Sequence, residues 1–379
     1  MLFVAGLSPS TVFCTASLAH ALRAAGHEVL VASNESIAAT AAAVGVPASS
    51  VTGMTLHQAI FQGRDGAALS PPEDPAGRRR FLGGMFGRFA AASLPGLHRL
   101  ARSWGPDAVI GVPLAFGAPL LATALDVPYI WHSWDAGEPG REEAGADEEL
   151  QPELAALGLG ELPAPDLRIE IGPAALRLPP SGPTVAMRWT PANRQEPLEE
   201  WMYSTPQGRR ICVTAGSRAT RESSLEFVRS LVTQVAGLDV ETMVAAPEDL
   251  AGALRTEIPG LRAGWLPLDV AMGTCDLLVH PGGGVSTMTA MRAGVPQVLV
   301  PEWDILLDTV RRSADYGAAI VLPPGQQDSD AVARACRKAL SDPTYRRQAR
   351  LLAEQMATLP SPAHVVAEIE KLVAARRAG

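Results

Sequence analysis

The sequence predicts an α/β protein with two domains, each a parallel sheet covered by helices on both faces. The chain has 379 residues, which is too long for one ordinary hydrophobic core and suits two domains of about 150 to 200 residues. A strand–helix–strand pattern begins with the first residues and recurs along the chain. The pattern restarts near Arg210, after a segment rich in turn residues, and this restart indicates a second Rossmann-like domain.

The first domain opens with a short apolar strand at residues 2–6, followed by a loop and a helix at about 15–25. Gly26 stands where a glycine commonly ends a helix. Three further strands are expected, at 28–32, 107–112 and 128–132. Because strands joined through helices pair in parallel, these elements predict a parallel sheet.

Two segments of the first domain lack clear periodicity. Residues 52–80 are rich in Gly and Pro and end in the basic cluster Arg78, Arg79 and Arg80. Long loops of this kind are either mobile or functional. Residues 135–165 are acidic and rich in Gly, Pro and Glu, and we expect their charges to lie on a solvated surface.

Residues 187–208 are rich in Pro, Asn and Gly and predict an interdomain linker. We place the first domain at 1–190, the linker at 191–208 and the second domain at 209–360. A C-terminal helix within 361–379 is expected to pack back on the first domain. The second domain is predicted to contain strands at 210–214, 239–245, 277–280 and 297–300 and helices at 223–235 and 330–340.

Composition disfavours several classes of function. The formal net charge of -8 argues against a nucleic-acid partner, because phosphate binding needs a basic surface. The four cysteines are too widely spaced for a zinc cluster or a disulfide scaffold, which predicts reduced thiols. The N-terminus has no basic segment, and the chain has no apolar run of about 20 residues. We therefore expect a cytoplasmic protein with no membrane span, and the sequence leaves both a monomer and a homodimer open.

The strongest local pattern is an apolar strand that runs into Gly282, Gly283 and Gly284 and then into a helical stretch from Thr287. Glycines let backbone N–H groups approach an anion, and the N-terminus of the following helix attracts negative charge. The loop lacks the Gly-Lys-Ser/Thr of a Walker loop and the spaced glycines of a dinucleotide fingerprint. The pattern therefore predicts a diphosphate site, with an ordinary strand-to-helix turn as the alternative.

Trp265 and Leu266 end a strand-like run just upstream of this turn. An indole at the carboxyl edge of a sheet offers a flat surface on which a nucleobase can stack. The alternative is a core residue, because Trp is largely buried on average. The neighbouring glycine turn favours an exposed indole that serves as a nucleobase platform.

Three stretches together resemble the donor-site signature of nucleotide-sugar glycosyltransferases of GT-B architecture, namely residues 265–268, 275–287 and 293–301. Residues 18–29 are similar to the first helix and second strand of the same family. More narrowly, and over nearly its whole length, the chain resembles actinobacterial enzymes that attach deoxysugars from TDP donors to antibiotic aglycones. The resemblance implies two facing Rossmann-like domains with a cleft between them, the first for the acceptor and the second for the nucleotide sugar.

The resemblance also implies donor-binding roles for individual residues. Trp265 would face the base, and Ser286 with the glycine turn would hold the diphosphate. Ser217 and Arg218 would contact phosphate from a facing loop, and acidic residues from 302 onward would lie near the sugar. The predicted donor-binding set is Ser217, Arg218, Trp265, Leu266, His280, Gly282, Gly283, Gly284, Val285, Ser286, Glu302, Asp304 and Asp308.

Two departures from the family pattern carry information. The family has a His immediately before its glycines, whereas this chain has Pro281 there and His280 one position earlier, so ligation of phosphate by His280 is an open question. Hexose transferases carry Asp-Gln where this chain has Ile305 and Leu306. Apolar side chains cannot hydrogen-bond sugar hydroxyls, and a deoxysugar donor is therefore expected.

A third departure concerns the general base. Family O-transferases carry a catalytic His in the first loop, and residues 8–13 contain none. Asp135 follows a predicted strand end beside two indoles, where desolvation would raise the pKa of its carboxyl toward use as a base. Asp135 is therefore the first candidate for the base and His132 the second. Similar features occur in C-glycosyltransferases of aromatic polyketide pathways, but O-transfer stays open, as does a pocket in which Asp135 has no chemical role.

The acceptor is expected to be an aromatic aglycone bound by the first domain. The predicted contacts are Ser10, Thr11, Phe13, Phe61, Met85, Phe86, Phe89 and Trp134, although Met and Phe at helical spacing are often core residues. The expected reaction is direct displacement with inversion. No cofactor or metal is expected, since helix and backbone donors would absorb the leaving charge. Rival functions are a nucleotide-sugar epimerase of the same fold and a catalytically inactive accessory partner, and the sequence leaves open whether an activator protein is needed.

Overall fold

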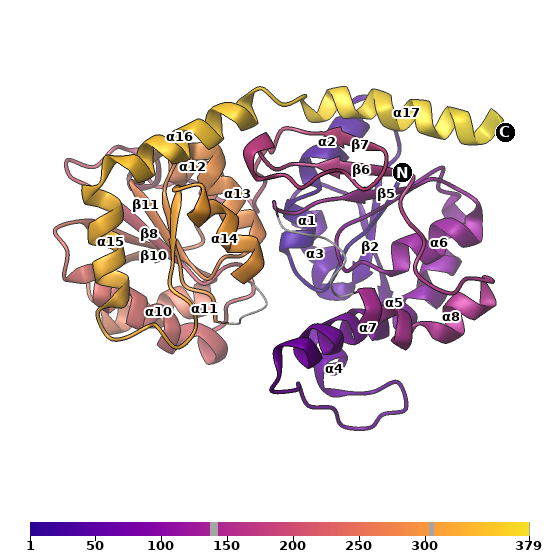
Figure 1. The fold of residues 1–379 in the computed structure, drawn as a ribbon, viewed down its shortest axis with the longest axis horizontal. Helices are drawn as coiled ribbons and strands as arrows, with labels where there is room; N and C mark the ends of the chain where they lie inside the picture. The colour runs from indigo at the N-terminus through magenta and orange to yellow at the C-terminus, as the bar shows by residue number, and fades with distance from the viewer. Residues whose placement is uncertain (137–142, 303–306, 379) are drawn as a thin grey trace.

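The computed structural model describes residues 1–136, 143–302 and 307–378. Two lobes lie side by side, each built on one sheet with helices packed on its faces (Figure 1). The first sheet has seven strands and the second has six, and their strand pairs are parallel. This architecture confirms the predicted α/β fold.

The first sheet has the strand order β3-β2-β1-β4-β5-β6-β7. β1, β4 and β5 are buried along their whole length, which explains why each reads as an apolar run. β3, β6 and β7 lie toward the two edges and are only partly buried, so their sequences lack that signal. The strands are β1 (Leu2–Val4), β2 (Leu30–Asn34), β3 (Ala48–Thr52), β4 (Val109–Gly111), β5 (Tyr129–His132), β6 (Leu167–Glu170) and β7 (Thr184–Ala186).

Helices cover both faces of the first sheet, and α4 with the start of α5 projects away from it (Figure 1). The predicted helix at 15–25 is confirmed, and a short helical turn precedes it where a loop was expected. The helices are α1 (Ser10–Phe13), α2 (Ala16–Ala24), α3 (Glu35–Ala43), α4 (Leu56–Phe61), α5 (Pro75–Trp104), α6 (Gly117–Leu125), α7 (Glu143–Glu149), α8 (Gln151–Ala156) and the 3₁₀ turn η1 (Ala174–Leu176).

Both segments predicted to be irregular contain helices. α5 begins at Pro75, and Asp74 caps it by accepting a hydrogen bond from the Gly77 N–H at 2.7 Å. The basic cluster at 78–80 therefore lies in the first turns of a helix, and the prediction of a loop there is wrong. α7 packs closely across α5, since a Cβ added to Gly145 would lie 2.0 Å from the Arg80 carbonyl oxygen.

The acidic run is likewise more than a solvated surface. Glu148 pairs with Arg80, and Glu149 pairs with the buried Arg88 at 3.1 Å. The Arg88 guanidinium also donates to the Ala59 carbonyl oxygen through Nε and Nη2. A buried charge needs such partners, so the acidic and basic segments fix each other in place.

The second sheet has the strand order β10-β9-β8-β11-β12-β13, with the predicted strands at its centre. Its strands are β8 (Arg210–Thr214), β9 (Glu241–Ala245), β10 (Arg262–Gly264), β11 (Leu277–His280), β12 (Gln297–Leu299) and β13 (Ala319–Val321). Its helices are α9 (Glu200–Tyr203), α10 (Arg221–Ala236), α11 (Glu248–Glu257), α12 (Leu268–Ala271), the 3₁₀ turn η2 (Met272–Thr274), α13 (Gly284–Ala293), α14 (Leu307–Asp315), α15 (Ala331–Ser341), α16 (Pro343–Ala357) and α17 (Pro362–Ala378).

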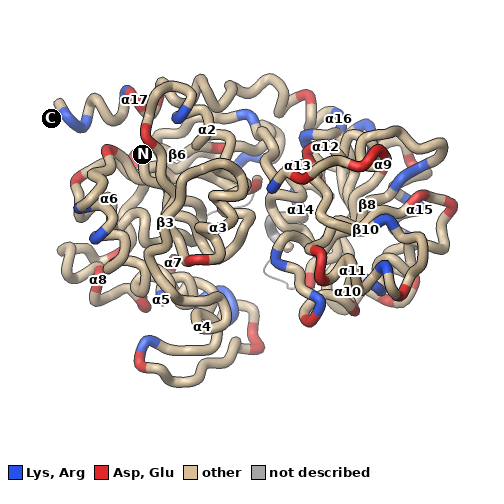
Figure 2. The backbone as a smooth tube through the Cα atoms, turned by 180° about the vertical axis from the view of Figure 1, so that it is seen from behind, with Lys and Arg blue, Asp and Glu red and all other residues tan. Residues whose placement is uncertain are grey.

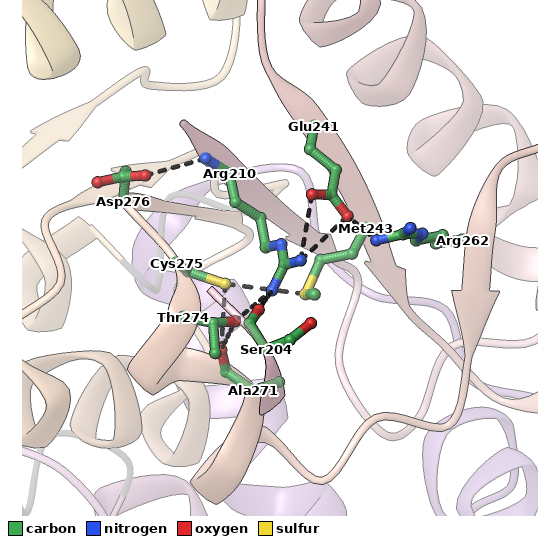
Figure 3. A network of polar contacts seen from close by, with 9 residues as sticks. All are labelled: Ser204, Arg210, Glu241, Met243, Arg262, Ala271, Thr274, Cys275 and Asp276. Atoms are coloured by element: carbon green, nitrogen blue, oxygen red, sulfur yellow. Dashed lines mark hydrogen bonds and ion pairs between the residues drawn. The ribbon is translucent and has the colours of Figure 1, made fainter. Parts of the chain in front are cut away.

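A buried arginine anchors the amino edge of the second sheet (Figure 3). Arg210, the first residue of β8, is 1% exposed, and its Nη2 lies 3.1 Å from both carboxylate oxygens of Glu241. Its Nη1 donates to the Ser204 carbonyl oxygen and to Thr274 Oγ1. Paired and hydrogen-bonded in this way, the charge is tolerated inside the lobe. The network lies at the edge opposite the carboxyl ends of the strands and is structural.

The chain crosses from the first lobe to the second over a short segment. Trp189 is 1% exposed and follows Met187, whose N–H donates to the Glu170 carbonyl oxygen of β6 at 2.8 Å. Four residues later, Asn193 donates to Asp269 of α12 at 2.8 Å and is already held by the second lobe. The crossing therefore lies at 190–192, and the residues after it pack with the second lobe.

The chain returns to the first lobe near Pro360, whose carbonyl oxygen accepts from the Arg188 N–H at 2.7 Å. The two crossings thus lie side by side. α17 then runs along α2 of the first lobe, buries Ile369 and pairs Arg376 with acidic residues of that lobe (Figure 1). None of the helices within the described ranges is both long and apolar enough to pass through a membrane.

Candidate functional site

The second sheet reverses its strand order between β8 and β11. In open parallel sheets, ligands bind in the crevice outside the carboxyl ends of the strands at such a reversal. Val213 of β8 pairs with Val279 of β11, so the loops that follow both strands leave at the same edge. These loops, 215–220 and 281–283, flank one crevice.

The glycine turn after β11 has a shape that only glycine allows at its first position. Gly282 has a φ of 94°, and an added Cβ would lie 2.5 Å from Val310 Cγ1. Gly283 is the N-cap of α13 and brings no side chain to cap its first N–H groups. These groups and the dipole of the ten-residue helix therefore offer a seat for an anion.

His280 supports this turn through a hydrogen bond to its backbone. Its Nδ1 accepts from the Gly282 N–H at 3.2 Å, so the proton is on Nε2, which donates to Gln297 Oε1 at 2.9 Å. The ring is fully buried, and burial lowers the pKa of His280 to about 4. Because both ring nitrogens are used within the protein, the prediction that His280 contacts the donor directly does not fit. Gln297 was missed, although a polar residue at the start of an apolar strand was the available signal.

Hydroxyl groups surround the anion seat. Thr287 Oγ1, in the first turn of α13, is buried and has no hydrogen-bond partner in the part of the chain that the structure describes. Ser286 and, across the crevice, Ser217 are half-buried. Gly216 has a φ of 87°, and its N–H donates to Thr214 Oγ1 at 3.0 Å, which fixes the facing loop.

The acidic residues predicted for the sugar are only partly described. Burial raises the pKa of Glu302, and the nearby Arg218 guanidinium acts in the opposite direction. Glu302 and Arg218 therefore lie near each other. Asp304 and the apolar pair after it lie outside the described residues, and the side chain of Asp308 is not described either.

Trp265 lies at the same edge but is less open than predicted. The indole is half-buried, its Nε1–H donates to the Arg194 carbonyl oxygen at 2.9 Å, and the Arg194 guanidinium lies 4.6 Å from the ring centroid. Phe13 of the first lobe approaches to 6.4 Å between centroids. Arg194 was missed because nothing near it in sequence marks a contact 71 residues away. Leu266 is buried in a core cluster, so only its backbone is available to a ligand.

The first sheet reverses its strand order between β1 and β4. A Cβ added to Gly6, after β1, would lie 3.3 Å from Thr11 Cγ2 and 3.9 Å from Phe86 Cε1. Thr11 and Phe86 thus meet at this reversal. The Thr11 hydroxyl donates to the Ser8 carbonyl oxygen at 2.6 Å, and Ser10 Oγ lies 2.8 Å from Ser8 Oγ.

The other predicted acceptor contacts divide into two groups. Met85 and Phe89 pack with Phe86 and residues of α4 in a small apolar cluster under the projecting part of the lobe. Phe61, in contrast, is 40% exposed and lies outside that cluster, with its ring tilted against that of His57 at 4.9 Å between centroids. The structure therefore brings the α5 residues together and leaves Phe61 apart.

Asp135 lies where the two lobes touch. It follows β5, is 9% exposed, and its Oδ2 lies 3.0 Å from the position of a Cβ added to Gly284. Figure 2 shows α13 and α14 on the side of the second lobe that faces the first. The carboxylate of the first candidate base is thus beside the anion seat, although the two residues are far apart in sequence.

His132, the second candidate base, is fully buried at the end of β5. Its Nδ1–H donates to the Ser133 carbonyl oxygen at 2.7 Å, and Nε2 has no partner within the described residues. Burial lowers the pKa of His132 to about 4. The ring is therefore neutral near pH 7, and it has no exposed surface through which an acceptor could reach it. Trp134, two residues on, is half-buried against a large apolar cluster to which both lobes contribute.

A second contact between the lobes was missed by the sequence. Arg312 of α14 donates through Nη1 to the carbonyl oxygens of Ala136, at 2.7 Å, and Leu176, at 3.2 Å. This bond holds the segment after β5 against the second lobe. No group of three or more His, Cys, Asp and Glu side chains that could hold a metal ion occurs among the described residues.

Family models match both lobes. The model described as the N-terminal domain of erythromycin biosynthesis protein CIII-like proteins matches residues 20–216, and the corresponding C-terminal domain matches residues 229–372. The first model alone covers more than half of the chain, and the second covers the glycine turn and α13.

Individual relatives match nearly full length. The chain is 32% identical to L-demethylnoviosyl transferase of Streptomyces niveus, over 94% of this chain and 93% of that protein. It is 32% identical to 3-alpha-mycarosylerythronolide B desosaminyl transferase of Saccharopolyspora erythraea, over 100% and 99%. Among solved structures, the glycosyltransferase SsfS6 of Streptomyces sp. SF2575, complexed with thymidine diphosphate, matches with a TM-score of 0.87 and 32% identity over 98% of this chain and 99% of that one.

Proposed function

The chain belongs to the erythromycin biosynthesis protein CIII-like family and is a glycosyltransferase, and we propose that it transfers a deoxysugar from a TDP-sugar to an aromatic polyketide aglycone. Membership confirms the predicted resemblance and the predicted enzyme class. The relatives' names describe transfer of demethylnoviosyl and desosaminyl groups, and the solved structure holds thymidine diphosphate. The nucleotide comes to this chain from that solved structure and the class of sugar from the relatives' names, whereas the aromatic acceptor is part of the proposal.

The observation that carries the proposal is the meeting of Asp135 with the start of α13. A glycosyl transfer needs an anion seat for the leaving diphosphate and, close to it, a group that takes the proton of the acceptor. The glycine turn and α13 supply the seat, and Asp135 lies beside Gly284 in that turn. The two functions therefore lie side by side, each contributed by a different lobe.

The proposed reaction is a single displacement. Asp135 accepts the proton of a phenol as the acceptor forms a bond to the anomeric carbon, and the bond from that carbon to the diphosphate oxygen breaks. Charge develops on the diphosphate as it leaves, and the N–H groups of α13 and the glycine turn stabilise it. These donors make a metal ion unnecessary, and attack opposite the leaving group inverts the anomeric centre.

The acceptor side favours a flat apolar molecule. Phe86 lies near Thr11 at the strand-order reversal, and Met85 and Phe89 back it. Aromatic and Met side chains suit aromatic ligands. A deprotonated phenol is also nucleophilic at its ring carbons, so the same base can support a C-glycoside. O-transfer to a similar acceptor is the second candidate product.

The test is a transfer assay with purified chain, a TDP-deoxysugar and a panel of polyphenolic aglycones. We expect a glycoside whose anomeric configuration, measured by NMR, is inverted relative to the donor, and no loss of rate in EDTA. Resistance of the product to acid hydrolysis identifies a C-glycoside, and cleavage identifies an O-glycoside. Conversion of the donor in the absence of any acceptor indicates an epimerase instead. Absence of turnover, with TDP still raising the unfolding temperature, indicates an inactive accessory protein.

A further inference from the structure

The three glycines of the turn have different surroundings. Gly282 needs its positive φ. Gly283 is exposed, and nothing lies within 4 Å of an added Cβ. Gly284 has no positive φ, but an added Cβ would lie 3.0 Å from Asp135 Cβ, from Asp135 Oδ2 and from the Trp134 carbonyl oxygen. A glycine is thus favoured at position 284 because the other lobe approaches too closely for a side chain.

This approach is tighter than an ordinary packing contact. Separations of 3.0 to 3.4 Å are shorter than nine in ten real Cβ contacts, and Gly284 would meet three atoms at that limit at once. One of the three is a backbone oxygen, which cannot rotate away as a side chain can. The neighbouring Ala136 is held by Arg312, so the segment 134–136 cannot retreat without stretching that bond.

We propose that Gly284 is a positioning residue. Because it has no side chain, the Asp135 carboxylate can lie at a short, fixed distance from the anion seat at the start of α13. The inference rests on the proposed function, because that distance matters only if Asp135 acts on an acceptor near the anomeric carbon. Anything larger at position 284 moves the carboxylate away from the reacting centre. A misplacement of about 1 Å can cost about 100-fold in rate.

The substitution is expected to leave the fold intact. Gly284 is the first residue of α13, its φ is not in the left-handed region, and alanine favours a helix more than glycine does. A loss of transfer in Gly284→Ala would therefore not come from unfolding. The cost should grow with side-chain size, from Gly284→Ala to Gly284→Val.

The experiment measures kcat for transfer and Kd for TDP in each variant. We expect kcat to fall about tenfold for Gly284→Ala and about 100-fold for Gly284→Val, with any loss of TDP affinity much smaller than the loss of kcat. Gly283→Ala is the matched comparator, because it adds a methyl group to the same turn without meeting Asp135, so any loss of transfer should accompany a loss of TDP affinity. Gly273→Ala, at an exposed position with no atom within 4 Å of the added Cβ, is the unaffected control.

A double-mutant cycle distinguishes positioning from a local defect. In an Asp135→Ala background, Gly284→Val should cost little further rate, because the group that it displaces is already absent. Additive losses would overturn the inference, as would unimpaired transfer in Gly284→Val or a loss of TDP binding equal to the loss of transfer. If the wild-type chain transfers sugar and any of these results is found, only this inference fails. A wild-type chain without transfer removes the proposed function as well.

Discussion

The two strand-order reversals of this chain are lined by different kinds of chemical group. Between β8 and β11 the lining is backbone, a glycine turn and the N-terminus of α13. Between β1 and β4 the lining is side chain, with Thr11 and Phe86 beside Gly6. Backbone N–H groups present the same donors whatever the sequence, whereas apolar side chains can be exchanged one at a time. Under the proposed function, the backbone N–H groups bind the diphosphate, which is the same in every donor. The side chains contact the aglycone, which varies from one acceptor to another.

Two histidines sharpen this contrast. His132 ends β5 and His280 ends β11, and both rings are fully buried with a pKa lowered by burial to about 4. His280 bonds through both nitrogens and links the glycine turn to Gln297. His132 bonds only to the carbonyl of the next residue among the described residues. The two histidines are therefore equally buried, but among the described residues His280 belongs to a hydrogen-bond network and His132 makes a single hydrogen bond.

The largest expected effect tests whether the acceptor lobe contributes the base. Asp135→Ala should lower the transfer rate by about 100-fold or more, since general bases contribute about that much, while TDP binding is retained. Asp126→Asn is the matched control, because Asp126 is an exposed carboxylate of the same lobe. Steady-state kinetics with calorimetric TDP titration measure both quantities. Unimpaired transfer in Asp135→Ala would reject the base assignment.

The second effect is a pH dependence of stability. Each histidine has a pKa of about 4 in the folded chain and an ordinary value of 6.5. Below pH 6.5 the histidine therefore binds a proton in the unfolded chain but stays neutral in the folded chain. Stability is therefore present above pH 6.5 and is lost as the pH falls toward 4. Between pH 7 and pH 5 the free energy of unfolding should fall by about 2 kcal/mol per histidine. Urea titrations check this, and each His→Leu variant should remove about half of the histidine-dependent slope.

The smallest effect separates the two histidines by function. His280→Leu leaves the Gly282 N–H without its acceptor and should weaken TDP binding about tenfold, the value of one hydrogen bond at the upper end of the usual range. His132→Leu is the matched variant, and it should leave TDP affinity unchanged. Calorimetric Kd values provide the comparison. Equal losses in the two variants would show that the link from His280 to the glycine turn has no effect on the nucleotide.

Much of the donor side could be predicted from the sequence. Gly282, Gly283 and Gly284 follow an apolar strand and precede a helix, and the structure contains that strand, turn and helix. Such a pattern is local, so a few adjacent residues specify it. His280 shows the limit, because its neighbours in sequence predicted a ligand while its partner Gln297, on the next strand, makes it a support for the turn.

The acceptor side was predicted less well. Residues 52–80 were expected to be a loop, yet they contain α4 and the start of α5, because α5 packs on α7 through ion pairs and α4 packs on α5. Those partners lie about 60 to 70 residues further along the chain, and no window of local periodicity contains both. Phe61 illustrates the same limit, since its spacing does not reveal that it faces away from the apolar cluster.

The sequence by itself determined the class of fold and the glycine turn, because each depends on the order of neighbouring residues. Only the tertiary structure decided that Asp135 meets Gly284, that Arg312 holds Ala136, and that His280 turns inward. These contacts join strands and helices that lie far apart along the chain. Their geometry depends on how two sheets pack against each other, and packing is a property of the whole folded chain.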